Sequence, residues 1–190
     1  ARRAAVRELR EEAGIDLDPA ADLPCFAHWL TPTFEPRRFD TLFFAAAAPA
    51  DQEPQSDRTE TTAALWVGLA EALDGSRADL FLPPPTLHTL ERLRAIGGDV
   101  ATLLRRLAAE GIGPCIMPHV VADGPGLRCV ALPWDALAPR AAEFVDLHGL
   151  ALRSMTAVAV VALDGPAVDR YELRDGRFWR LSDGTLCSEA

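Results

Sequence analysis

Three glutamates near the start of the chain have a spacing that could bind a divalent metal ion. Glu8, Glu11 and Glu12 stand at i, i+3 and i+4, so on a helix all three side chains project from one face. Carboxylates at this density repel one another unless a cation lies between them. Hard oxygen ligands suit Mg²⁺ and Mn²⁺, which keep open positions for substrate phosphates. The spacing therefore indicates a magnesium or manganese site.

The same segment also has a simpler interpretation, as a solvated helix surface. Arg7 and Glu11 form an i, i+4 pair, although in the weaker orientation, and Arg3 or Arg10 could neutralise another carboxylate. Mixed arginine and glutamate faces are common and usually do no more than remain hydrated. Spacing alone leaves both interpretations open.

The element that must position these glutamates is a helix over residues 1–13. Ala5, Leu9 and Ala13 recur at i, i+4 and i+8, which predicts one apolar strip along it. Gly14 is suited to a left-handed C-cap, and Ile15 can fold back against the last turn. The chain lacks an initiator Met and begins within this helix, so we expect it to continue a longer protein.

The rest of the chain predicts a mixed α/β unit over residues 1–110 and a β-rich extension over residues 111–190. In the first part, the apolar run at 41–49 suits a strand buried on both faces. Gly97-Gly98 separates two helical patterns, and Asp99 is placed to cap the second. Further strands are predicted at 23–30, 114–121, 127–133 and 155–163, a short strand running into a helical turn over 64–73, further helical segments at 86–96 and 100–110, and a hairpin at 170–181 about Asp175-Gly176.

Composition excludes several classes of protein. With 190 residues, 49% hydrophobic and 25% charged, the chain is long enough to bury a core and is not typical of disorder. A net charge of −9 argues against nucleic-acid binding, because phosphate backbones are bound by clustered cations. The chain shows no signal peptide and no apolar span of about 20 residues, so we expect no membrane association and a cytoplasmic location.

Cysteine, histidine and tryptophan residues suggest no further site. The cysteines are far apart and form no C-x-x-C pair, which argues against structural zinc and gives no support for disulfides. The histidines share no ligand spacing, and we expect the tryptophans to lie in the core or at its rim. These residues are Cys25, Cys115, Cys129, Cys187, His28, His88, His119, His148, Trp29, Trp66, Trp134 and Trp179.

The segment Arg7 to Ile15, RELREEAGI, resembles the second half of the Nudix box, G-x5-E-x7-R-E-U-x-E-E-x-G-U, where U is a bulky aliphatic residue. It matches at every specified position. Ala1 to Val6 fill six of the seven preceding x positions, so the first glutamate and the glycine of the box would lie upstream of Ala1. The resemblance implies a Nudix hydrolase with an α/β/α sandwich around a mixed sheet, entered in its signature helix and lacking its N-terminal strands.

The resemblance also implies roles for individual residues. Arg7 would orient Glu8, and Glu8, Glu11 and Glu12 would bind Mg²⁺ or Mn²⁺ or activate water. Family members often add a distal acid from a later loop, and Glu60 matches that position best, although it could equally be a solvated loop residue.

The segments 31–49, 60–67 and 82–93 resemble the branch that contains coenzyme A and acyl-CoA diphosphatases. That branch implies a CoA-type substrate, and Arg37 and Arg38 would then contact its 3′-phosphate or pyrophosphate, because the guanidinium fork suits phosphate. The two arginines could instead pair with Glu35 and Asp40.

The leading hypothesis is a metal-dependent Nudix diphosphatase that cleaves a nucleoside-diphosphate-linked substrate such as CoA or acyl-CoA. The alternatives are a non-catalytic Nudix-like nucleotide-binding module and an inert truncated fragment. The complete set of Arg7, Glu8, Glu11 and Glu12 favours the enzyme. The expected partner is a small nucleotide-type molecule, with no nucleic acid and no membrane, and a homodimer is left open.

Overall fold

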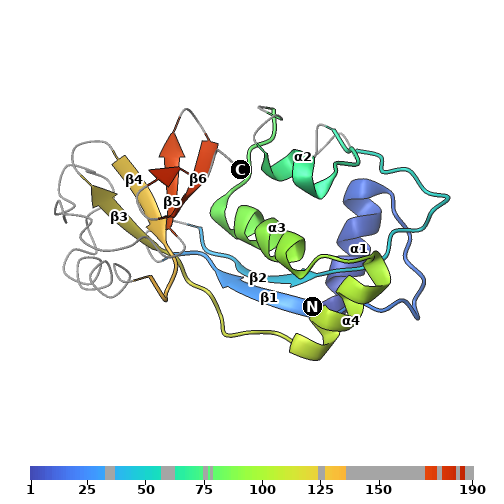
Figure 1. Cartoon of the computed structure of the whole chain (residues 1–190). Helices are drawn as coiled ribbons and strands as arrows, with labels where there is room; N and C mark the ends of the chain where they lie inside the picture. The colour runs from blue at the N-terminus through green and yellow to red at the C-terminus, as the bar shows by residue number, and fades with distance from the viewer. Residues whose placement is uncertain are drawn as a thin grey trace. The chain divides into compact units, whose positions relative to one another are not determined.

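A computed structural model describes the helices and most of the strands that these patterns predict (Figure 1). The described residues are 1–32, 37–56, 63–74, 77, 79–123, 127–135, 170–174, 177–182 and 185–186. Glu60 and the predicted strand at 155–163 lie outside them. The helices are α1 (Arg2–Ala13), α2 (Leu69–Leu73), α3 (Pro84–Ile96) and α4 (Val100–Glu110). The strands are β1 (Cys25–Leu30), β2 (Asp40–Phe44), β3 (His119–Asp123), β4 (Leu127–Ala131), β5 (Arg170–Arg174), β6 (Arg177–Ser182) and β7 (Thr185–Leu186).

The strands of the described residues form two small sheets. One consists of β1 and β2, and the other has the order β3-β4-β5-β6-β7 with every neighbouring pair antiparallel. Helices mixed with small sheets are consistent with the predicted α/β class. The α/β/α sandwich arrangement stays a prediction.

The chain divides into two compact units, each built from separate segments. The first unit contains residues 1–28, 42–73 and 90–114, and the second contains residues 29–41, 74–89 and 115–190. The predicted division of the chain near residue 110 stays a prediction.

In the first unit, local capping defines the helices as the sequence predicts. Gly14 adopts a left-handed conformation with φ 66°, and its N–H donates to Arg10 O at the end of α1. Gly97 and Gly98 also have positive φ, where a side chain would be strained, and they separate α3 from α4. Asp99 then accepts a hydrogen bond from Thr102 N at 2.7 Å and caps α4.

Side chains of Arg92 and Arg106 link α3 and α4 within the first unit, and Arg106 Nη1 donates to Ile96 O at 2.7 Å. Arg92 Nη1 donates to Phe26 O at 2.6 Å, and its Nη2 forms an ion pair with Glu110 of α4 at 2.6 Å. Leu107 of α4 is fully buried. The apolar face of α4 therefore packs into this unit while its ends are held by capping and by charge.

The strand prediction for the apolar run at 41–49 was wrong in its burial and its length. β2 ends at Phe44, its first two residues are exposed, and its last three are half-buried. Within the described residues β2 pairs with β1 alone. The short strand predicted at the start of 64–73 is not formed either, whereas the helical turn predicted after it is α2.

The second unit carries the predicted hairpin and a polar core. Arg174 pairs with Arg177, so β5 and β6 are joined by a two-residue connection at the predicted position. Arg170, Tyr171 and Glu172 are all buried, although alternate residues of a strand point to opposite faces. The His88 ring lies against Trp29, Trp134 and Tyr171, and its Nδ1 lies 2.9 Å from the Tyr171 hydroxyl. His88 and Trp29 are therefore packing residues, as the sequence indicated.

Two further findings concern the cysteines and the helices. Cys25 and Cys115 are free thiols, and burial raises the pKa of Cys25. Among the described helices, none is both long enough and apolar enough to span a lipid bilayer.

Candidate functional site

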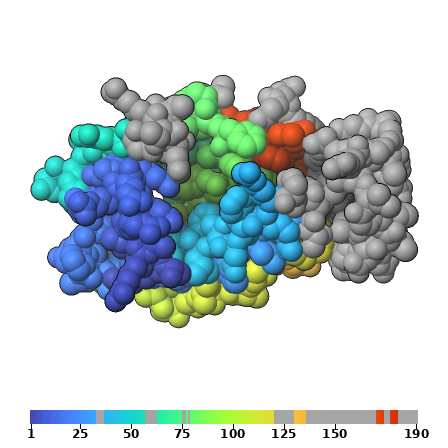
Figure 2. All heavy atoms as spheres, turned by 180° about the vertical axis from the view of Figure 1, so that it is seen from behind, coloured from blue at the N-terminus to red at the C-terminus, as the bar shows by residue number. Residues whose placement is uncertain are grey.

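The helix α1 presents the predicted carboxylates to solvent. Side chains of Arg7, Glu8 and Glu11 are each more than half exposed. None of the residues of α1 is fully buried, and Figure 2 shows its atoms on the surface of the molecule. The helical periodicity therefore places the three glutamates where a dissolved ion or substrate can reach them.

Arg7 lies between two of the carboxylates. Its Nη2 is 3.6 Å from Glu8 Oε1, and its Nε is 3.5 Å from Glu11 Oε2. The sequence offered a metal site and an ion-paired surface as alternatives, and this arrangement shows the ion pairs. Both distances are long and both pairs are exposed, so solvent screens them and each contributes little stability. A bound cation could replace Arg7 at Glu11 at small cost.

The carboxylate oxygens fit Mg²⁺ or Mn²⁺ in their chemistry, because both ions prefer a few carboxylates and exchangeable positions. In the structure, however, the three carboxylates do not converge on one position. In the part of the chain that the structure describes, no three histidine, cysteine, aspartate or glutamate side chains are grouped closely enough to hold a metal ion. Glu12 makes an interaction of its own. A metal site on α1 would therefore need the carboxylates to change rotamer.

The two predicted phosphate contacts have different surroundings. Arg38 Nε donates to Thr31 O at 2.9 Å, and its Nη2 approaches the Met117 sulfur at 3.6 Å. Arg37 is exposed. Arg38 is therefore tied to Thr31, directly after β1, while Arg37 is the better candidate for a ligand contact. Both belong to the second unit and the carboxylates of α1 to the first.

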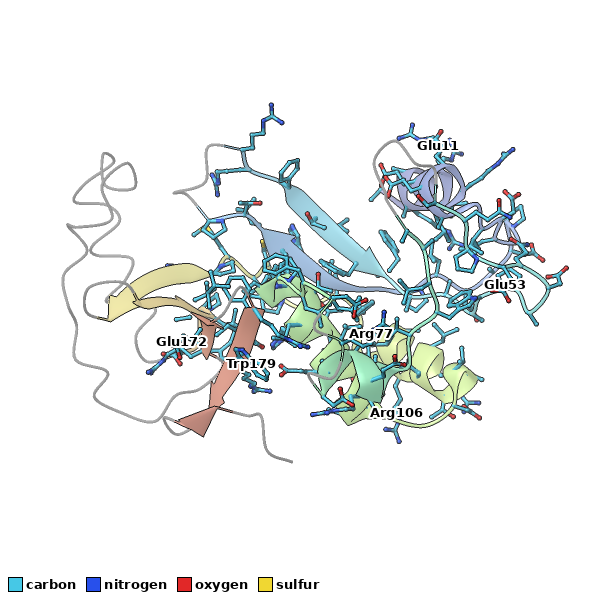
Figure 3. All side chains as sticks on the ribbon, turned by 90° about the horizontal axis from the view of Figure 1, so that it is seen from above. Glu11, Glu53, Arg77, Arg106, Glu172 and Trp179 are labelled. Atoms are coloured by element: carbon cyan, nitrogen blue, oxygen red, sulfur yellow. The ribbon has the colours of Figure 1, made fainter. Side chains whose placement is uncertain are left out.

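A loop that sequence reasoning did not single out contacts the C-terminal end of α1. The backbone of Asp16 and the side-chain amide of Gln52 exchange two hydrogen bonds, and Gln55 N donates to Ala13 O at 2.8 Å. In the same loop, Glu53 accepts a hydrogen bond from Trp66 Nε1 at 3.0 Å; Glu53 and Glu11 are labelled in Figure 3. The polar composition of residues 50–60 is typical of a loop but carries no signal for these contacts.

Comparison with known families bears directly on this region. Residues 1–85 match the model of the NUDIX domain. The match covers α1, β1, β2 and α2, and it includes every described residue to which the sequence assigned a role. The match supports the Nudix likeness read from RELREEAGI, and proteins of this family are pyrophosphohydrolases that generally use Mg²⁺ or Mn²⁺. No curated protein and no solved structure matches the chain.

Proposed function

We propose that this chain is a metal-dependent Nudix diphosphatase acting on a nucleoside-diphosphate-linked substrate. The observation that carries the proposal is the coincidence of the NUDIX match over residues 1–85 with the exposed carboxylate face of α1. A solvated helix face alone would be unremarkable, but within a NUDIX-like segment these same positions are those expected to bind metal.

In the proposed reaction, water attacks one phosphorus of the diphosphate and the bridging oxygen leaves with the other phosphate. The products are two phosphate monoesters. Bound Mg²⁺ or Mn²⁺ would offset the charge that gathers on the phosphoryl oxygens. Glu8, Glu11 and Glu12 would hold it, and Glu8, oriented by Arg7 at 3.6 Å, would accept the proton of the attacking water. Glu60, outside the described residues, is proposed as a second acid.

The proposed substrate is CoA or acyl-CoA, which would be cleaved to 3′,5′-ADP and a phosphopantetheine. The basis is the likeness of residues 31–49 to the CoA diphosphatase branch together with the exposure of Arg37. Arg37 would contact the 3′-phosphate, and Arg38 would shape the loop that carries it through its bond to Thr31 O. The predicted cytoplasmic location and the homodimer stay predictions.

A nucleotide-binding module without catalysis is a second candidate. It is favoured by one observation, that the acids of the described residues do not gather into a group of three around a metal position. Such a module would bind the nucleotide and leave it intact.

One experiment separates the two candidates. The purified chain is incubated with CoA, dephospho-CoA, ADP-ribose or NADH, with Mg²⁺, Mn²⁺ or EDTA, and the products are separated by chromatography while binding is followed by calorimetry. Metal-dependent release of 3′,5′-ADP from CoA supports the diphosphatase. Binding of CoA without turnover supports the module, and neither binding nor turnover of any of the four substrates contradicts both.

A further inference from the structure

The placement of α1 depends on polar contacts more than on burial. Its apolar residues are half-buried, and none of the residues of this helix is fully buried. Helices in proteins usually gain most of their stability from packing an apolar face. Because α1 has little of that packing, its direction and the position of its carboxylate face depend on the polar contacts at its ends.

At the C-terminal end of α1, the main contacts are made by the side chain of Gln52. Asp16 N–H donates to Gln52 Oε1 at 2.8 Å, and Gln52 Nε2 donates back to Asp16 O at 3.1 Å. The side-chain amide thus pairs with a backbone residue as a neighbouring strand would. Gln55 N–H adds a backbone bond to Ala13 O at 2.8 Å.

Asp16, the residue to which Gln52 is hydrogen-bonded, lies where the chain leaves α1. Ile15, directly before Asp16, is buried, and Asp16 Oδ1 pairs with Arg10 Nε of α1 at 3.3 Å. Gln52 therefore holds a residue that is anchored to the core on one side and to the helix on the other. Glutamate in place of Gln52 would lose the donor, and asparagine would be one methylene too short.

We propose that Gln52 is a positioning residue for the metal-binding face of α1. It fixes the exit of the helix through Asp16, so that the helix face bearing Glu8, Glu11 and Glu12 keeps the direction from which these carboxylates, after a change of rotamer, would share one cation. The inference rests on the proposed metal-dependent function. Contacts outside the ligand shell set ligand orientation, and losing one typically weakens metal affinity by about 10- to 100-fold.

The test uses Mn²⁺ itself as the probe. Mn²⁺ binding to the metal-free chain is titrated by electron paramagnetic resonance, beside amide hydrogen exchange of residues 10–17 without metal. Gln52→Ala should weaken Mn²⁺ binding about 10-fold and speed exchange at Asp16. Gln52→Glu, which keeps the acceptor for Asp16 N–H, should give a smaller loss. Circular dichroism at the assay temperature checks that every variant is folded.

Gln55→Ala is the matched control, because it removes a side chain from the same loop and keeps the backbone bond to Ala13. It should leave both the Mn²⁺ affinity and the exchange rate unchanged. Equal Mn²⁺ affinity in Gln52→Ala and the unaltered chain would overturn the positioning role. Equal exchange rates at Asp16 in the two proteins would show that Gln52 does not stabilise the end of α1. Absence of Mn²⁺ binding that depends on Glu11 would instead overturn the proposed metal site, while the exchange measurement still decides whether Gln52 fastens α1.

Discussion

Asp135 and Arg170 form a fully buried ion pair in the second unit. Arg170 Nε lies 3.1 Å from both carboxylate oxygens of Asp135 and donates to them. Arg170 Nη2 is 3.0 Å from Asp135 Oδ1, close enough for ion pairing but not aligned as a hydrogen bond. Trp134, directly before Asp135, and Tyr171, directly after Arg170, both contact His88. The ion pair therefore positions two of the aromatic side chains that pack against His88.

Replacing Asp135 with Asn should strongly destabilise the protein. The arginine would stay buried without its counter-charge, which typically costs about 3–5 kcal/mol. The double variant Asp135→Leu with Arg170→Met should lose less, because no buried charge remains. Urea unfolding followed by tryptophan fluorescence measures both. Asp79→Asn is the control, since the Arg77–Asp79 pair is at the surface, and it should cause no measurable change. A single variant as stable as the double would contradict the argument.

The carboxylates of α1 should separate by role when each is changed to Gln. Glu8→Gln should lower turnover by about 10²- to 10⁴-fold if Glu8 is the base. Glu11→Gln and Glu12→Gln should raise the Mg²⁺ or Mn²⁺ concentration needed for half-maximal rate, because each removes a ligand charge. Glu110→Gln, which removes a carboxylate from the ion pair with Arg92, is the control for lost charge. If the dependence of the rate on metal concentration is alike in all four variants, α1 is a solvated surface and does not bind the metal.

Arg37 should distinguish CoA from substrates without a 3′-phosphate. A charge-assisted hydrogen bond to phosphate is worth about 1.5–3 kcal/mol, so Arg37→Ala should lower kcat/KM for CoA by about 10- to 100-fold. Turnover of dephospho-CoA should change little. Arg38→Ala should affect both substrates, because it also releases the bond to Thr31 O. If Arg37→Ala slows CoA and dephospho-CoA equally, Arg37 does not contact the 3′-phosphate.

Because of His119, the free energy of unfolding should decrease in mild acid. Burial lowers the pKa of His119 below its ordinary value of 6.5. Below that value the unfolded chain takes up a proton that the folded chain resists, so stability present above pH 6.5 is lost as the pH falls through the folded pKa. Urea midpoints measured from about pH 8 to about pH 5 should fall less for His119→Gln than for the unaltered chain. Parallel curves for the two proteins would show that His119 does not contribute.

Several features of the fold and the candidate site could be predicted because they depend on near neighbours in the chain. The apolar strip and Gly14 predicted α1, and the Asp99 cap separates α4 from α3 through a contact three residues away. The two-residue connection between β5 and β6 has the same local origin. The spacing of Glu8, Glu11 and Glu12 also placed them on one helical face, since helix geometry alone sets that relation.

The burial of the apolar run at 41–49 could not be predicted in this way. Seven of these nine residues are apolar, or eight with proline, which is typical of a strand covered on both sides. Whether a strand is buried depends on what packs against the two faces of its sheet, and no residue of β2 is fully buried. An apolar run in the sequence does not record which other segments pack against those faces.

The sequence by itself determined the carboxylate helix, its end at Gly14 and the likeness to the Nudix box, because these depend on spacings of a few residues. Tertiary structure alone decided which distant residues meet within each unit. Gln52 meets Asp16 across 36 positions, Asp135 meets Arg170 across 35, and His88 meets Tyr171 across 83. Such pairs form only when the packing of the rest of the chain brings distant segments together, and no short spacing in the sequence records that packing.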